Sequence, residues 1–157
     1  MAKRIKMIKK LKYNYSKHGN GADIELEVDL SRFNKQYGEA QYLLDSRVMT
    51  SMERFMPKVT NTFINVTKAM SAAIAGSGTV VAAAPPMGRF LYEGKVMVDP
   101  ETNSPWARKG AKKVVTDKNL IYDKSANPDA TDHWFVPAKE SDLDLWLKEV
   151  KETAGGG

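Results

Sequence analysis

Hydrophobic and acidic positions alternate strictly along residues 22–30 of the chain. The even positions from Ile24 to Leu30 are all apolar, and the odd positions between them hold only Glu or Asp. A period of two is typical of a strand that buries one face and leaves the other in water. Strands of this kind belong mostly to antiparallel sheets, so we expect such a sheet here.

The next stretch changes to a helical period. Apolar side chains recur every three or four residues, at Phe33, Tyr37, Ala40, Leu44, Val48, Met52 and Phe55. This spacing predicts an amphipathic helix of about 25 residues, roughly 38 Å long at 1.5 Å per residue. Ser31 offers an N-cap, and Pro57 ends the helix because the residue before a proline avoids helical backbone angles.

The middle of the chain favours short strands. Residues 63–66 and 69–75 have the composition of strands, and a Gly-Ser-Gly turn separates them from a partner strand at residues 79–84. Residues 87–94 then form a short aromatic turn, and residues 95–98 form another strand.

The last third of the chain combines loops with one helix. Residues 99–105 are rich in turn formers, and residues 114–115 and 120–122 are expected to pair as a hairpin. Residues 123–132 are polar and irregular. The apolar residues that follow predict a helix over roughly residues 137–152.

These elements predict an α+β fold, in which a small, mostly antiparallel sheet packs against one long helix and a C-terminal helix. A length of 157 residues suits one domain with its own core. We assign residues 1–21 to a basic N-terminal arm, residues 22–152 to the domain and residues 153–157 to a flexible tail.

The net charge of +5 is unevenly distributed. Residues 1–22 hold seven of the 24 basic residues and no acid, so the rest of the chain has 17 basic residues against 19 acidic ones. The last helix is acidic, with seven acids against three lysines from Asp129 onward. A basic arm can bind nucleic acid, a membrane surface or an acidic protein, and the alternative is a solvated tail.

One uncharged stretch, residues 69–88, has the length of a membrane span. Its glycines, two prolines and many alanines favour short strands around a turn over a spanning helix. The basic N-terminus lacks the apolar core of a signal peptide, because lysines interrupt it. We therefore expect a soluble protein with no membrane partner, made in the cytoplasm.

Candidates for catalysis and cofactor binding are few. The chain has no Cys and only two His, which excludes disulfides, thiolate metal sites and His-rich clusters. Asp132-His133 is the one acid–histidine neighbour pair, residues 76–78 lack the lysine of a phosphate-binding loop, and the acids of residues 25–29 indicate a solvated strand face. We expect no enzymatic activity, no cofactor and no metal.

Two stretches are stronger candidates for interaction sites. The first, residues 88–95, places Tyr92 and a second aromatic between two glycines, which permit a tight turn of the backbone. Arg89 and Glu93 could then pair across an interface. The alternative is an ordinary turn in the core.

The second stretch, residues 106–113, gathers four basic residues beside a tryptophan and a glycine. The basic residues are Arg108, Lys109, Lys112 and Lys113, and the tryptophan is Trp106. Such a cluster can contact phosphates or an acidic partner. The alternative is a solvated loop.

The run from Arg89 to Lys118 closely resembles the minor capsid proteins of tailed phages and prophages of Gram-positive bacteria. Residues 56–88 fit the same pattern, and so does Asp132-His133-Trp134-Phe135 at the entrance to the last helix. The resemblance covers roughly residues 40–150.

This family is similar to the neck, or tail-completion, proteins of long-tailed phages. In those proteins a Pro-x-x-Thr-Gly-x-Leu turn follows a long helix, and here residues 57–63 match it with Asn61 in place of glycine. Asparagine also tolerates a left-handed backbone, so we expect the turn to survive. Phe90–Gly94 matches a second turn of the family, and residues 99–130 form an insertion.

The resemblance implies a structural virion protein of the neck, which joins capsid and portal to the tail as a six- or twelve-fold ring around the DNA channel. Its partners would be copies of itself, adjacent neck, portal-adaptor or tail-terminator proteins, and the DNA backbone. The candidate subunit or DNA contacts are Lys3, Arg4, Lys6, Lys9, Lys10, Arg89, Tyr92, Glu93, Trp106, Arg108, Lys109, Lys112, Lys113 and Trp134. The alternative is a free nucleic-acid-binding protein that uses the arm and residues 108–113.

Overall fold

The computed structural model describes residues 10–15, 24–58 and 60–156. In chain order the elements are β1 (Lys10–Tyr15), β2 (Ile24–Asp29), α1 (Ser31–Glu53), α2 (Asn61–Ile74), α3 (Gly88–Glu93), β3 (Lys95–Val98), β4 (Val114–Asn119) and α4 (Phe135–Thr153).

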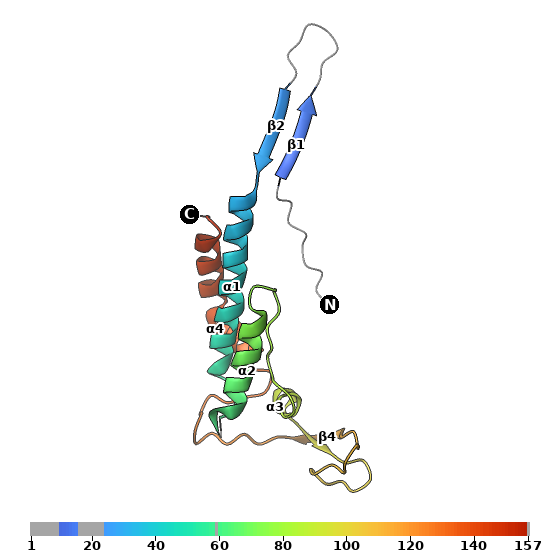
Figure 1. Ribbon diagram of the computed structural model, residues 1–157. Coiled ribbons are helices and arrows are strands. Elements are labelled where there is room, and N and C mark those ends of the chain that lie inside the picture. Colours follow the sequence, from blue (N-terminus) through green and yellow to red (C-terminus); the bar gives the residue numbers. More distant parts are fainter. Residues whose placement is uncertain (1–9, 16–23, 59, 157) are drawn as a thin grey trace.

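The molecule is elongated (Figure 1). The β1–β2 hairpin projects at one end, the helices α1, α2 and α4 form the middle, and α3 leads to the β3–β4 sheet at the other end. This combination confirms the predicted α+β class. The strands form two separate two-stranded antiparallel sheets, whereas the sequence predicted a sheet packed on the long helix.

The β1–β2 hairpin contains the strand predicted at residues 22–30. Its register runs from Lys10↔Asp29 to Tyr15↔Ile24. The expected burial of one face is wrong, because the hairpin stands clear of the helices (Figure 1) and Leu26 is 53% exposed.

Helix α1 confirms the predicted long helix, and α4 confirms the predicted C-terminal helix. The two run antiparallel, joined by an ion pair between Arg47 and Glu149 at 2.7 Å and by a hydrogen bond from the Ser51 hydroxyl to Asp142. The bond from Ser51 is the main reason why the pKa of Asp142 lies below its usual range.

The start of α1 differs in detail from the predicted cap. Ser31 is the first helical residue, and its backbone N–H donates to the Asp29 carboxylate at 2.8 Å. This bond is the main cause of the lowered pKa of Asp29. The capping side chain is therefore Asp29, which satisfies a helix N–H that would otherwise lack a partner.

Helix α2 replaces the strands that the sequence predicted at residues 63–66 and 69–75. Ile64, Thr67 and Ser71 are buried, and their spacing of three and four residues places them on one helix face. The Thr67 hydroxyl donates to the Phe63 carbonyl oxygen at 2.9 Å, one turn earlier. Asn61 begins this helix and needs no left-handed backbone, so the expected turn geometry at this position is wrong.

Residues 79–84 are extended but form no strand in the described structure, contrary to the prediction. They lie along α2, and hydroxyl groups of that helix bind their backbone. Ser71 Oγ donates to the Val81 carbonyl oxygen at 2.9 Å and accepts from its N–H at 3.0 Å. Thr67 Oγ1 accepts from the Ala84 N–H at 3.1 Å. These bonds replace those that a partner strand would make.

The predicted Gly-Ser-Gly turn is present between α2 and this extended segment. Gly76 and Gly78 both have positive φ, and their N–H groups donate to the buried Asp45 carboxylate at 2.7 and 3.1 Å. Gln41 Nε2 donates to the other oxygen of Asp45 at 2.8 Å. One buried acid of α1 thus fixes the path of the chain after α2.

Strand β3 confirms the strand predicted at residues 95–98, but β4 replaces the hairpin predicted at residues 114–115 and 120–122. It pairs antiparallel with β3, from Val98↔Val114 to Lys95↔Asn119. The loop between the two strands therefore returns the chain beside β3, and the insertion seen in the sequence forms the end of the molecule opposite the β1–β2 hairpin (Figure 1).

The core lies where α1, α2 and α4 meet. Its buried members are Met49, Met52, Met56, Ile64, Trp134, Ala138 and Trp146. Trp134 is fully buried, and its Nε1–H donates to the Ala82 carbonyl oxygen at 2.9 Å. Among the described helices, none combines the length and the apolar character that a membrane crossing requires.

Candidate interaction surface

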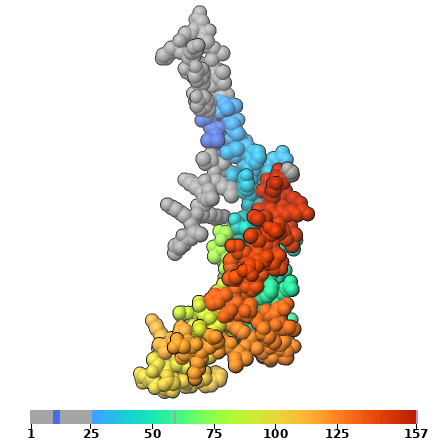
Figure 2. Space-filling model, turned by 180° about the vertical axis from the view of Figure 1, so that it is seen from behind, coloured from blue at the N-terminus to red at the C-terminus, as the bar shows by residue number. Residues whose placement is uncertain are grey.

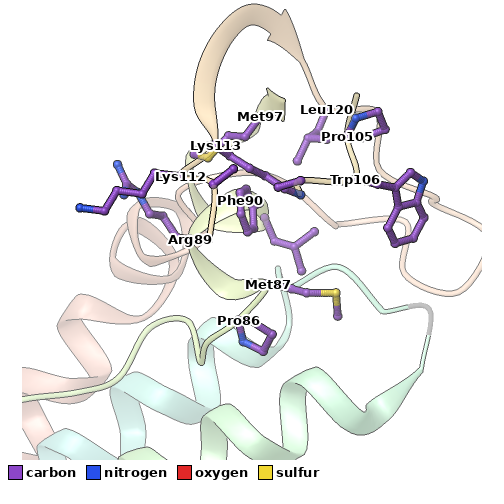
Figure 3. Close-up of a pocket in the computed structure, with 13 residues that line it drawn as sticks. Pro86, Met87, Arg89, Phe90, Met97, Pro105, Trp106, Lys112, Lys113 and Leu120 are labelled. Atoms are coloured by element: carbon purple, nitrogen blue, oxygen red, sulfur yellow. The ribbon is translucent and has the colours of Figure 1, made fainter. Parts of the chain in front are cut away.

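A groove of about 850 Å³ opens on the lobe that α3, β3, β4 and the loop between the strands form (Figure 3). Its lining is mainly apolar and carries three basic side chains. The lining residues are Pro86, Met87, Arg89, Phe90, Leu91, Met97, Pro105, Trp106, Ala107, Ala111, Lys112, Lys113 and Leu120. The two stretches that the sequence singled out, residues 88–95 and 106–113, therefore meet here.

The short helix α3 presents Phe90 to the groove because glycines fix both of its ends. A Cβ at Gly88 would lie 2.5 Å from the Ala83 carbonyl carbon, so only glycine fits there. Gly94 has φ of +64° and ends the helix in the left-handed region. The sequence predicted a short aromatic turn at residues 87–94, whereas the structure has a six-residue helix between the two glycines.

The other wall of the groove is held by Asp99. This residue is fully buried, and its carboxylate accepts backbone N–H bonds from Glu101, Thr102 and Arg108 at 2.9, 3.3 and 3.1 Å. The Arg108 guanidinium also donates to both of its oxygens. These bonds, with Arg108 the largest contribution, hold the pKa of Asp99 well below its usual range.

Arg108 is consequently part of the loop's framework. It pairs with buried Asp99 at 2.9 Å and with Glu101, and both acids raise its pKa further. The sequence offered Arg108 as a contact for phosphates or a partner, but its guanidinium is already occupied by two carboxylates. The sequence missed Asp99, which appeared there only as a turn former.

The remaining basic residues of the groove and of the loop stay on the surface. Lys113 lies over the Phe90 ring, with its Nζ 4.8 Å from the ring centroid, and partly covers the groove floor. Arg89 and Lys112 are exposed at one end of the groove (Figure 3). Lys109 is exposed as well, outside the groove lining.

Trp106 stands at the opposite end of the groove (Figure 3) and is 85% exposed. Met87, which the sequence did not single out, is 57% exposed in the same lining. Aromatic residues, Met and Arg are the residue types enriched at protein interfaces. A large exposed indole on an apolar groove therefore indicates a surface for a protein partner.

Three other candidate residues lie away from this groove. Trp134 is in the core, so the expectation that it contacts a neighbouring subunit or DNA is wrong. Tyr92 packs edge-to-face on Trp134, with the two ring centroids 4.9 Å apart, and burial raises the pKa of the Tyr92 hydroxyl. Glu93 lies 3.7 Å from His133 Nε2. The described contacts of Arg89 include no pair with Glu93 within the chain.

The basic arm is only partly described. Lys3, Arg4, Lys6 and Lys9 lie outside the described residues. Lys10 forms an ion pair with Glu27 across the hairpin at 2.7 Å, and Lys12 lies 3.5 Å from the same carboxylate. The described part of the arm is therefore neutralised in part by the strand beside it.

A second apolar surface, the outer face of α4, runs along that helix and borders α1 at Leu147, which lines a second pocket with Tyr37 and Leu44. Val136, Leu143 and Leu147 are spaced by seven and four residues, and they are exposed. Figure 2 shows that α4 lies at the surface of the molecule in the view from behind. The sequence contains this second stripe, but the pattern was interpreted only as the core face of the helix.

The described residues offer no group of three His, Cys, Asp or Glu side chains that could hold a metal ion. No family model, curated protein or solved structure matches this chain. Both surfaces are suited to bind apolar segments of a protein that carry charged side chains beside them. Asp99 and the two glycines of α3 keep the groove in shape.

Proposed function

We propose that the protein is a structural subunit of the neck of a long-tailed phage, which assembles as a ring between the head and the tail around the DNA channel. The observation that carries this proposal is the apolar groove with Trp106 exposed on it, on a chain with a second uncovered apolar stripe on α4. Uncovered apolar surfaces of this kind are typical of proteins that function within an assembly.

The sequence resemblance supports the same role. It covers roughly residues 40–150, which include the groove, the core and most of α4. The β1–β2 hairpin that projects beyond the helices also suits a subunit that reaches a neighbour (Figure 1). Its neighbours would be copies of itself and other proteins of the neck, with the DNA backbone passing through the channel.

A free nucleic-acid-binding protein is less well supported. Arg108 is occupied by Asp99 and Glu101, and Lys10 is occupied by Glu27. Fewer cations of residues 108–113 therefore remain for phosphates than the sequence suggested. Outside residues 1–22 the chain has a slight acidic excess, which repels DNA.

Two measurements test the proposed role. Native mass spectrometry of the purified full chain should give one closed oligomer, and six or twelve subunits are expected for a neck ring. Deleting the gene from the phage that encodes it should leave filled heads and separate tails in the lysate. Normal infectious particles from the deletion strain would contradict the proposal.

A further inference from the structure

We propose that the groove of one copy binds the outer face of α4 of a second copy, and that this contact joins neighbouring subunits. The inference rests on the proposed function and names the two surfaces that would form its ring. In this contact the apolar side chains of Val136, Leu143 and Leu147 enter the groove. Glu140 and Asp144 are their charged neighbours.

The chemistry of the groove defines what it can bind. Its floor consists of apolar side chains, including Phe90, Met97 and Leu120, and its lining contains no acid. Arg89 and Lys112 are exposed at one end and form no ion pair within the described chain (Figure 3). The matching partner is an apolar segment with carboxylates beside it.

The outer face of α4 has this composition. Val136 and Leu147 are 50% and 59% exposed, and Leu143 lies between them on the same face. Glu140 and Asp144 are exposed on the adjoining part of the helix surface. Neither acid forms a hydrogen bond or ion pair within the described chain.

One copy cannot join these two surfaces to each other. Helix α4 is fixed against α1 by the Arg47–Glu149 pair and the Ser51–Asp142 bond. The groove lies on the lobe beyond the end of these helices (Figure 1). Each copy therefore leaves both surfaces open to other copies.

The two surfaces are also different from each other. A contact between unlike patches is heterologous, and it generates a ring when the rotation between copies closes. A symmetric dimer through one shared patch would end after two copies. The proposed pairing thus accounts for a cyclic assembly, which a self-complementary patch would not.

Charge reversal on each side gives the test. The groove variant is Arg89→Glu/Lys112→Glu, and the helix variant is Glu140→Lys/Asp144→Lys. Each places like charges opposite each other in the contact, so each alone should weaken association at least about 100-fold and leave monomers in native mass spectrometry. All four side chains are exposed, so thermal unfolding of the monomer should stay unchanged.

The decisive step combines the two variants. Mixed at equal concentration, they should form alternating rings of equal composition, because each reversed groove then meets a reversed helix. The chain that carries all four substitutions should form rings by itself. A matched control, Lys118→Glu/Lys124→Glu, changes the net charge by the same amount as the groove variant, but on exposed residues outside the groove. It should assemble as the unchanged chain does.

Several outcomes would overturn the inference. Rings from either reversed variant alone would show that the groove does not hold α4, while the proposed function would stand. Loss of rings without recovery in the mixture would exclude this pairing as well. If only the groove variant loses its rings, another segment of the chain occupies the groove. A monomeric unchanged chain would contradict the proposed function itself.

Discussion

At the scale of single residues, the tryptophans separate core from surface. Trp134 is fully buried with its indole N–H bonded to Ala82, whereas Trp106 is 85% exposed. We expect Trp134→Phe to lower the free energy of unfolding by about 2–3 kcal/mol, because it leaves the Ala82 carbonyl without its donor and opens a void. Urea unfolding followed by circular dichroism measures this.

The matched control is Trp106→Phe, which should change the free energy of unfolding by no more than about 0.5 kcal/mol. Equal losses in the two variants would mean that Trp106 is packed in the folded chain. The sequence could not distinguish these two indoles, because the burial of Trp134 depends on Ala82 and Tyr92, which lie far from it along the chain.

The lowered pKa of Asp99 determines how the loop between β3 and β4 should respond to acid. The pKa of Asp99 is lower in the folded chain than the usual aspartate value of 3.8, so its stabilising contribution is present above that pH. The contribution is lost as the pH falls through the lowered pKa. A pH titration by NMR, observed at the backbone amide of Glu101, should therefore show a midpoint clearly below 3.8.

Arg108→Gln tests the cause of this shift. The Arg108 side chain is the largest reason for the lowered pKa, so the variant should move the Asp99 midpoint upward, toward 3.8. An unchanged midpoint would show that the backbone N–H groups alone hold the carboxylate. The sequence presented Arg108 as a free cation because the acids that bind it become partners only when the loop closes.

At the scale of elements, α2 and the extended segment after it depend on hydroxyl groups. Thr67→Val keeps the shape of the side chain but removes the acceptor for the Ala84 N–H. We expect a loss of about 1–3 kcal/mol in the free energy of unfolding, since that N–H stays buried without a partner. Thr62→Val, on the exposed side of the same helix, should cost less than about 0.5 kcal/mol. An unchanged free energy of unfolding in Thr67→Val would contradict the assigned role of the hydroxyl.

The sequence predicted correctly those elements whose own residues carry a clear pattern, and it missed those that depend on polar inward positions or on a distant partner. The strict alternation of residues 22–30 and the long period of residues 33–55 set β2 and α1 without help from other parts of the chain. In α2, the inward positions include Thr67 and Ser71, so a search for an apolar stripe misses the helical face. Strand β4 was divided in two because its partner, β3, lies across a loop of 15 residues, 99–113.

At the scale of the whole molecule, the projecting hairpin should be dispensable for folding. Leu11 and Leu26 are about half exposed, and the core lies among the helices. Removing residues 1–27, which keeps Asp29 at the start of α1, should leave the thermal midpoint of the monomer nearly unchanged. A midpoint lowered by more than about 5 °C would mean that the hairpin supports the core.

Assembly is the other property of the whole molecule, and the sequence indicated it only through a family resemblance. The groove itself could not be predicted, since residues 86–87, 89–91, 97, 105–107, 111–113 and 120 meet only through the β3–β4 pairing and the Asp99 loop. The basic arm and the acidic last helix are visible in the composition. Each carries less unpaired charge in three dimensions, because Lys10 of the arm pairs with Glu27 and Glu149 of the last helix pairs with Arg47.

The mass of the purified full chain in native mass spectrometry, measured at increasing concentration, tests the proposed function most directly. A ring subunit should give one closed species, at a multiple of the 17.5 kDa chain that no longer grows with concentration. A chain that stays monomeric at every concentration, and is also missing from purified virions of its phage, would contradict the assignment to the neck.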